Sequence, residues 1–170
     1  GVRPVSIEVR KWEGGQLLQR LPGHPDIELA FGAPYMTLHR AELHAAICAR
    51  VPPGVLRLGA KCIGIADHAQ GIELRFADGS RTLADAAVGA DGLRSTLRAG
   101  VEASPPRFSG KMACRVLVPA ESVARLADPP LVRMWLGPGV HVVSYPVSGG
   151  RLLNLAAALP ADMNPIVVYK

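Results

Sequence analysis

Glycine and proline divide this chain into short segments, and their spacing limits the fold more than any other feature. They account for 18 and 15 of the 170 residues. Proline lacks a backbone donor and glycine favours turns, so few long helices fit between them. One uninterrupted stretch, residues 37–50, is rich in helix formers, with Leu43 and Ile47 on one face, and VPPG at residues 51–54 ends it. The chain is therefore predicted to be α+β, with more strand than helix.

Short runs between the turns predict strands. Residues 6–12 alternate Ile7 and Val9 with polar neighbours, and a turn at residues 14–15 leads into residues 16–20. Asp78-Gly79 is centred between two further runs, which predicts an antiparallel hairpin. Residues 86–90 (AAVGA) are apolar and uncharged, as expected of a strand buried on both faces, and a short helix is predicted at 95–99. Residues 21–34 are expected to form a loop. Further strands are expected at 55–58, 62–66, 71–76, 81–83, 114–118, 131–136, 140–145 and 151–159.

The composition argues against several classes of protein. With 49% hydrophobic and 19% charged residues, the chain is too apolar and too sparsely charged to be disordered throughout. It has no run of 18 apolar residues, so no membrane span is predicted, and its first residues lack the apolar core of a secretion signal. Cys48, Cys62 and Cys114 lie far apart, and the histidines show no metal-ligand spacing. We therefore expect no disulfide framework, no metal site and a cytoplasmic location.

The charge of the chain bears on its ligands. The net charge is +5, from 19 Lys and Arg against 14 Asp and Glu. The arginines are scattered singly, which is not the pattern of a nucleic-acid-binding protein. Single arginines suit a small anion, such as a carboxylate or a phosphate-bearing cofactor. We expect a small-molecule ligand and no nucleic-acid partner.

Residues 88–98 (VGADGLRSTLR) combine features of an anion site. The predicted strand ends at Asp91 and Gly92, and a helix start with Arg94 and Arg98 follows. Glycine lets the backbone approach a ligand closely, and a helix N-terminus offers free N–H groups to a phosphate. The alternative is an ordinary strand, turn and helix in which Asp91 is only the N-terminal cap.

His141 and Tyr145 are candidates for chemistry on a substrate. They lie four residues apart in a predicted strand, so both side chains point to one face. A histidine can accept a phenolic proton near neutral pH, and a tyrosine can donate a hydrogen bond to a substrate oxygen. The alternative is a structural histidine beside a core aromatic residue.

Four segments in order resemble the flavin-dependent aromatic hydroxylases, single-component monooxygenases of the salicylate hydroxylase and p-hydroxybenzoate hydroxylase type. The run G-A-D-G-x-x-S-x-x-R at residues 89–98 resembles the family's middle fingerprint. LHRAEL at 38–43 resembles its helix with an arginine against the flavin cofactor. FSGKMACRVLVP at 108–119 and WLGPGVHVVSYPVSGGRLLN at 135–154 resemble two segments of its substrate domain.

The resemblance implies a fold, a reaction and residue roles. It implies an antiparallel or mixed substrate-domain sheet with part of an FAD-binding domain: residues 1–36 and 101–170 in the sheet domain, and 37–100 in the FAD domain. It implies FAD, NAD(P)H and O2 as reactants, and an aromatic or heteroaromatic carboxylate as substrate. His141 would be the base and Tyr145 the orienting group. The implied FAD-binding residues are Arg40, Cys62, Asp91, Gly92 and Arg98.

The sequence also departs from the family pattern. The G-x-G-x-x-G segment that binds the ADP part of FAD and the later G-D segment are absent, and Cys114 and Val116 replace a tryptophan and a glycine. Arg115, between these two positions, is left open: it could pair with an internal carboxylate or face the substrate. We therefore expect an internal piece or a truncated relative of such an enzyme. A non-catalytic remnant that binds a ligand or a subunit, without binding FAD alone, is the alternative. Sheet edges left without partners favour a homodimer or aggregation.

Overall fold

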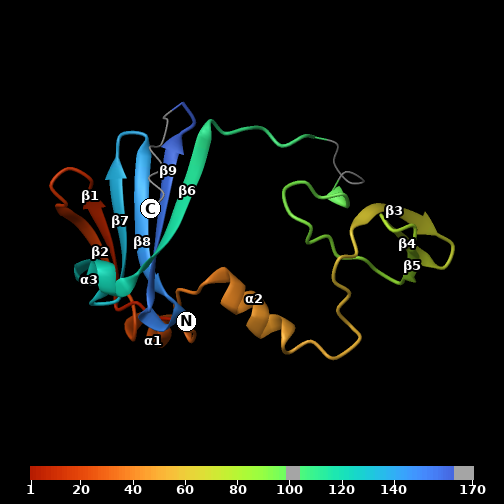
Figure 1. Ribbon diagram of the computed structural model, residues 1–170, viewed down its shortest axis with the longest axis horizontal. Helices are drawn as coiled ribbons and strands as arrows, with labels where there is room; N and C mark the ends of the chain where they lie inside the picture. Colours follow the sequence, from red (N-terminus) through yellow and green to blue (C-terminus); the bar gives the residue numbers. More distant parts are fainter. Residues whose placement is uncertain (99–103, 163–170) are drawn as a thin grey trace. The chain divides into compact units, whose positions relative to one another are not determined.

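The structure is a computed structural model and describes residues 1–98 and 104–162. The chain forms two compact units (Figure 1). The large unit contains Gly1–Arg50 and Ser109–Lys170, and the small unit contains Val51–Phe108. The predicted boundaries at residues 36 and 100 separate functional domains rather than these compact units, and they stay a prediction.

The large unit is built on a six-stranded mixed sheet with the order β2-β1-β7-β8-β9-β6. All neighbouring strands are antiparallel except β1 and β7, which are parallel. Figure 1 shows these strands side by side. Their bounds are β1 Ser6–Lys11, β2 Leu17–Pro22, β6 Lys111–Pro119, β7 Leu131–Gly137, β8 Val140–Val147 and β9 Leu152–Pro160.

Short helices connect these strands. They are α1 Asp26–Phe31, α2 Arg40–Cys48, η2 Ala120–Val123, α3 Ala124–Ala127 and η3 Ser148–Gly150. The apolar core lies in the sheet and consists of Leu131, Val132, Val147 and Leu153. Among the described residues, no helix has the length and apolar character needed to cross a membrane.

A buried carboxylate joins three strands of this sheet. Glu8 of β1 lies opposite Arg20 of β2 and Arg133 of β7 in the strand register. Its oxygens lie 2.7 Å from guanidinium nitrogens of Arg10 and Arg20 and 3.8 Å from Nε of Arg133. The exposed fraction of Glu8 is 1%. Burial alone would raise the pKa of Glu8, but the hydrogen bonds from Arg10 and Arg20 outweigh it and the pKa is lowered.

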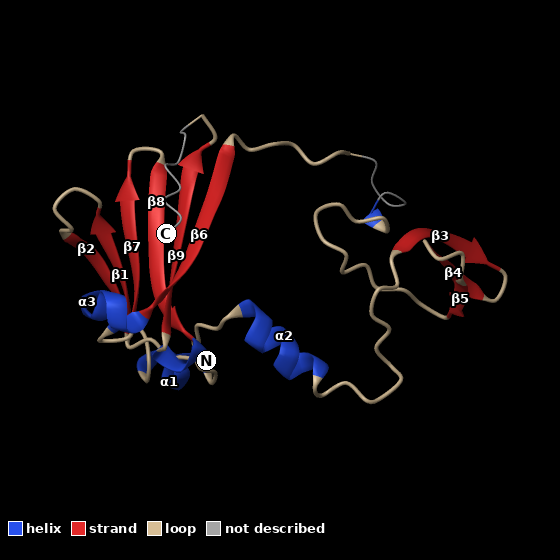
Figure 2. Cartoon of the chain, in the orientation of Figure 1, coloured by secondary structure: helices blue, strands red, loops and turns tan. Residues whose placement is uncertain are grey.

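The small unit is a three-stranded antiparallel sheet of β3 Cys62–His68, β4 Gly71–Phe76 and β5 Arg81–Ala84, joined to long loops (Figure 2). Arg57 fixes one loop to the sheet: its Nη2 donates to Asp78 Oδ2 at 2.7 Å, and its guanidinium lies 5.2 Å from the centre of the Phe76 ring. No residue that the structure describes in this unit is buried.

Most of the predicted elements are confirmed. The α+β class, the hairpin around Asp78-Gly79 and the strands in both halves are present. The helix predicted from residue 37 begins at Arg40. It starts later because Thr37 pairs with Val2 and donates from Oγ1 to the carbonyl of Pro146, which holds its backbone in an extended bridge.

Four predictions of local structure are wrong. Residues 55–58 pair with no strand that the structure describes, and Val55 is 70% exposed. Residues 86–90 are irregular rather than a buried strand, and Val88 is 89% exposed. Residues 95–97 form no helix, Arg98 has a 3-10 conformation, and residue 99 lies outside the described residues. The predicted loop at 21–34 contains α1, which ends at Gly32 in the left-handed conformation.

Candidate active site

A pocket of about 380 Å³ opens in the large unit, on one face of the six-stranded sheet. The start of α2 and strands β6, β8 and β9 contribute its walls. The polar side chains that line it are His39, Arg40, Arg115, Tyr145 and Asn154. The structure therefore brings together two predicted site residues, Arg40 and Tyr145, that lie more than a hundred residues apart in the sequence.

The strand register places three of these side chains on one face. Asn154 of β9 lies opposite Tyr145 of β8 on one side and Leu117 of β6 on the other. Paired residues in a ladder point to the same face, and so do residues two apart on one strand. Arg115, two residues before Leu117, therefore shares this face with Asn154 and Tyr145.

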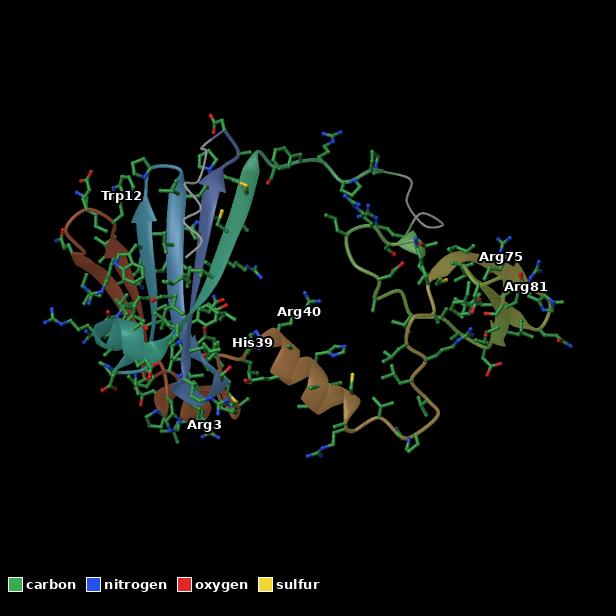
Figure 3. The ribbon with its side chains drawn as sticks, in the orientation of Figure 1. Arg3, Trp12, His39, Arg40, Arg75 and Arg81 are labelled. Atoms are coloured by element: carbon green, nitrogen blue, oxygen red, sulfur yellow. The ribbon has the colours of Figure 1, made fainter. Side chains whose placement is uncertain are left out.

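Thr37 anchors the other wall of the pocket. Its backbone exchanges two hydrogen bonds of 2.9 Å with Val2, and its hydroxyl donates to the carbonyl of Pro146, next to Tyr145 on β8. The exposed fraction of Thr37 is 6%. This anchor fixes the chain just before α2 begins, so that His39 and Arg40 lie at the first turn of the helix (Figure 3).

The pocket carries positive charge. Among the residues that the structure describes, no carboxylate lies within 4.0 Å of the guanidinium of Arg40 or Arg115. Burial raises the pKa of Tyr35, and the neighbouring Tyr145 raises it further. The pocket contains Arg40, Arg115 and Tyr145, and the phenol of Tyr35 lies near that of Tyr145. Such a combination of positive charge and aromatic rings is suited to an aromatic anion.

Sequence reasoning did not identify Tyr35 or Asn154 as site residues, and it left open whether Arg115 faces substrate or an internal carboxylate. Asn154 and Arg115 reach the pocket through pairing between strands. Tyr35 comes near Tyr145 by folding of the segment before α2. No local pattern in the sequence reports these contacts.

His141 lies outside this pocket. It is exposed on β8, opposite Leu136 and Ala158, and strand alternation places it on the same face as Tyr145. The shared face agrees with the sequence argument, while its role as a base stays a prediction.

The small unit holds a second pocket, of about 680 Å³, around the turn at residues 91–98. Asp91, Gly92 and Arg98 all line it. Gly92 has φ +80°, and an added Cβ would meet no atom within 4 Å. Arg98 donates from its guanidinium to the carbonyl of Ser104 at 3.3 Å.

Asp91 fixes the conformation of this turn. Its carboxylate accepts a hydrogen bond from Oγ of Ser95 and a second from the backbone N–H of Thr96 at 2.6 Å. These bonds, that of Ser95 first, lower the pKa of Asp91. Asp91 therefore fixes the turn through its own side chain, while Gly92 and Arg98 line the pocket beside it.

Cys62 begins β3 and does not line the second pocket. Its thiol donates to the carbonyl of Gly64 at 3.4 Å, and its own carbonyl accepts a bond from Oγ1 of Thr96 at 3.5 Å. The backbone of Cys62 thus ties the turn at 91–98 to the sheet of the small unit.

Comparison with known proteins first gives a class. Homologues of the chain are named as FAD-dependent monooxygenases or as monooxygenases of aromatic compounds. The chain is thus homologous to the FAD-dependent aromatic monooxygenases, which confirms the resemblance drawn from its four segments. No family model matches it.

One relative shows the extent of the similarity. The 3-amino-4-hydroxybenzoate 2-monooxygenase of Streptomyces cremeus is 40% identical over 157 residues, covering 92% of this chain and 40% of the relative. The chain thus spans about 40% of the length of the curated relatives it matches.

Solved structures agree on the fold. A substrate complex of salicylate hydroxylase superimposes with a TM-score of 0.72 and 26% identity, over 99% of this chain and 44% of that one. HpxO of Klebsiella pneumoniae, complexed with FAD and uric acid, gives a TM-score of 0.79 at 24% identity, over 94% and 41%. The latter likeness shows the fold alone.

Proposed function

We propose that this protein is an FAD-dependent monooxygenase that uses NAD(P)H and O2 to hydroxylate an aromatic or heteroaromatic carboxylate. The observation that carries the proposal is the pocket of the large unit, where Arg40, Arg115 and Tyr145 meet without a neutralising carboxylate among the described residues. The Streptomyces cremeus relative is named for a substrate with both a carboxylate and a phenol. The names of the relatives give no support to a non-catalytic remnant.

The residues present fit FAD in part. The turn at 91–98 leaves open space beside Gly92 and places Arg98 on the same pocket wall, which suits a phosphate-bearing group. Arg40, Cys62, Asp91, Gly92 and Arg98 stay proposed as FAD-binding residues, with Asp91 acting by shaping the turn. Bound FAD would supply the activation of O2, which side chains cannot perform.

The chain's own residues would position the substrate and handle its proton. Tyr145 would donate a hydrogen bond from its hydroxyl to the phenolic oxygen. His141, on the same face, would accept the phenolic proton at a ring nitrogen, and the resulting phenolate is richer in electrons at the ring carbon to be hydroxylated. The apolar lining residues Leu38, Leu117 and Val147 would exclude water from the ring.

FAD binding is tested on the 170-residue chain. We expect saturable quenching of flavin fluorescence at micromolar FAD, and roughly tenfold weaker binding in Arg40→Gln and Arg98→Gln, since a lost charged hydrogen bond is worth about that factor. Arg125→Gln, an exposed arginine outside both pockets, is the control. Equal binding by all four proteins would contradict the assigned FAD contacts.

Hydroxylation is tested in a chimera, in which this chain replaces the matching stretch of the Streptomyces cremeus monooxygenase. We expect oxidation of NAD(P)H that depends on the aromatic carboxylate, with a hydroxylated product. His141→Ala should lower the rate about 10²-fold or more at neutral pH, as expected for loss of a general base. A chimera that holds FAD but forms no product would contradict the proposed function, and unchanged hydroxylation in His141→Ala would remove the base role.

We further propose a homodimer and a cytoplasmic location. The edge strand β2 is exposed along its whole length, which supports pairing with a second copy. All three cysteines are free, which supports a reducing compartment. Light scattering after gel filtration tests the first proposal: a monomer at tens of micromolar contradicts it.

A further inference from the structure

We propose that Arg115 binds the carboxylate of the substrate and thereby selects anionic aromatic compounds. This inference rests on the proposed function and assigns a residue of that pocket whose role the sequence left open. The guanidinium lines the pocket and has no carboxylate within 4.0 Å among the described residues. An arginine without a counter-ion, beside apolar walls, attracts a carboxylate and can bind it through two parallel hydrogen bonds.

The strand register gives the separation between Arg115 and Tyr145. Strand β9 lies between β6, which carries Arg115, and β8, which carries Tyr145. Two strand spacings are about 10 Å and the register offsets the two residues by two positions along the strands, so their backbones lie about 12 Å apart, and both side chains are long enough to bridge much of that distance. A ring with a carboxylate at one end and a hydroxyl at the other can therefore contact Arg115 and Tyr145 together. A substrate with a neutral group in place of the carboxylate would lose one of its two fixed ends.

Asn154 occupies the floor between these two residues. It lies directly opposite Tyr145 in the ladder and lines the same pocket. Its Nδ2 is buried and has no acceptor among the described residues. Buried amide groups without a partner are rare, and each asks for an explanation. A substrate oxygen held between Arg115 and Tyr145 would provide the acceptor after a small rotation of the amide.

Arg40 and Arg115 line the same pocket but are assigned different ligands. Arg40 is proposed to contact FAD from the start of α2, whereas Arg115 stands on the sheet beside Asn154 and Tyr145. Loss of Arg40 should therefore weaken FAD binding, while loss of Arg115 should weaken binding of the aromatic anion and leave FAD binding unchanged.

The test compares one ligand with its neutral analogue on the 170-residue chain. The probes are 3-amino-4-hydroxybenzoate and the corresponding carboxamide, titrated into ¹⁵N-labelled protein. We expect Arg115→Met to weaken carboxylate binding roughly 10- to 100-fold and carboxamide binding less than about threefold. Arg115→Lys, which keeps the charge but loses the planar fork, should lie between. Arg125→Met is the matched control, and the amide spectrum of each variant reports whether it is folded.

The outcomes separate this inference from the proposed function. Equal loss of both ligands in Arg115→Met, no change in either, or no binding of the carboxylate to the wild-type chain would overturn the role of Arg115. Hydroxylation by the chimera that is indifferent to Arg115→Met would overturn it while leaving the proposed function intact. Carboxylate binding that depends on Arg115, in a chimera that holds FAD and forms no product, would overturn the proposed function alone.

Discussion

The large and small units differ in how they bury their side chains. The large unit contains every residue that the structure describes as buried, including Leu153 at 0% exposure and Glu8 at 1%. The small unit has no buried residue among those described, and Leu58 and Val88 are 77% and 89% exposed. A three-stranded sheet without a buried face gains little from apolar burial, so its order depends on ladder and turn hydrogen bonds. Substitutions should therefore act through different mechanisms in the two units.

The largest effect is expected from Glu8→Gln in the large unit. The substitution leaves the side chain of Arg133, which is 9% exposed, without its charged partner. Removing one member of a buried ion pair costs about 3–5 kcal/mol of unfolding free energy. Urea denaturation measures this loss. Glu13→Gln is the control, because the Lys11–Glu13 pair is exposed and should contribute less than about 1 kcal/mol.

The contribution of Glu8 should also depend on pH. Because the pKa of Glu8 is lowered in the folded state, its contribution is complete above the unfolded pKa and is lost as pH falls through the folded value. The wild-type urea midpoint should thus fall more between pH 6 and pH 3 than that of Glu8→Gln. Parallel pH profiles for the two proteins would show that Glu8 is not ionised in the fold.

A slightly smaller effect is expected from Leu153→Ala. Leu153 is fully buried on β9, opposite Pro146 of β8 and Val118 of β6. Truncation to alanine leaves a cavity and should cost about 3 kcal/mol. Leu58→Ala in the small unit removes the same atoms from an exposed site and should change stability by less than about 0.5 kcal/mol. Similar losses for the two variants would contradict the contrast in burial.

The smallest effect is expected from Gly71→Ala in the small unit. Gly71 has φ +132°, and an added Cβ would collide with the carbonyl of Ala84 on β5. We expect a local loss of about 2 kcal/mol, seen as faster amide hydrogen exchange in residues 62–84 with little change in the large sheet. Gly79→Ala is the matched control: it also has positive φ, but open space surrounds its Cβ position, so only about 1 kcal/mol should be lost.

Local signals in the sequence predicted the local parts of the fold. The Asp78-Gly79 turn predicted the hairpin because two neighbouring strands need only a compatible turn between them. The prediction of a buried strand at residues 86–90 was wrong because an apolar, uncharged run has the composition of a buried strand whether or not partner strands exist. The parallel pairing of β1 with β7 was not predicted, since nothing near Ser6 indicates that Leu131 lies opposite.

The same distinction applies to the candidate site. The resemblance to known hydroxylases singled out Arg40 and Tyr145, and the structure places both in one pocket. Tyr35 and Asn154 were missed because their approach to Tyr145 depends on the path before α2 and on the β8–β9 register. Cys62, also selected by resemblance, contributes its backbone carbonyl to the turn at 91–98, and its role toward FAD stays a prediction.

The parallel pairing of β1 with β7 has a consequence for biosynthesis. Ser6 cannot meet Leu131 until the ribosome has produced the whole small unit and the strand that follows it. Closing so long a loop carries an entropic cost and slows the productive search. Until then, Glu8 of the β1–β2 hairpin can pair with Arg10 and Arg20 but not with Arg133. A nascent chain halted before β7 should therefore expose the β1–β2 hairpin to chaperones or to another nascent chain on the same polysome.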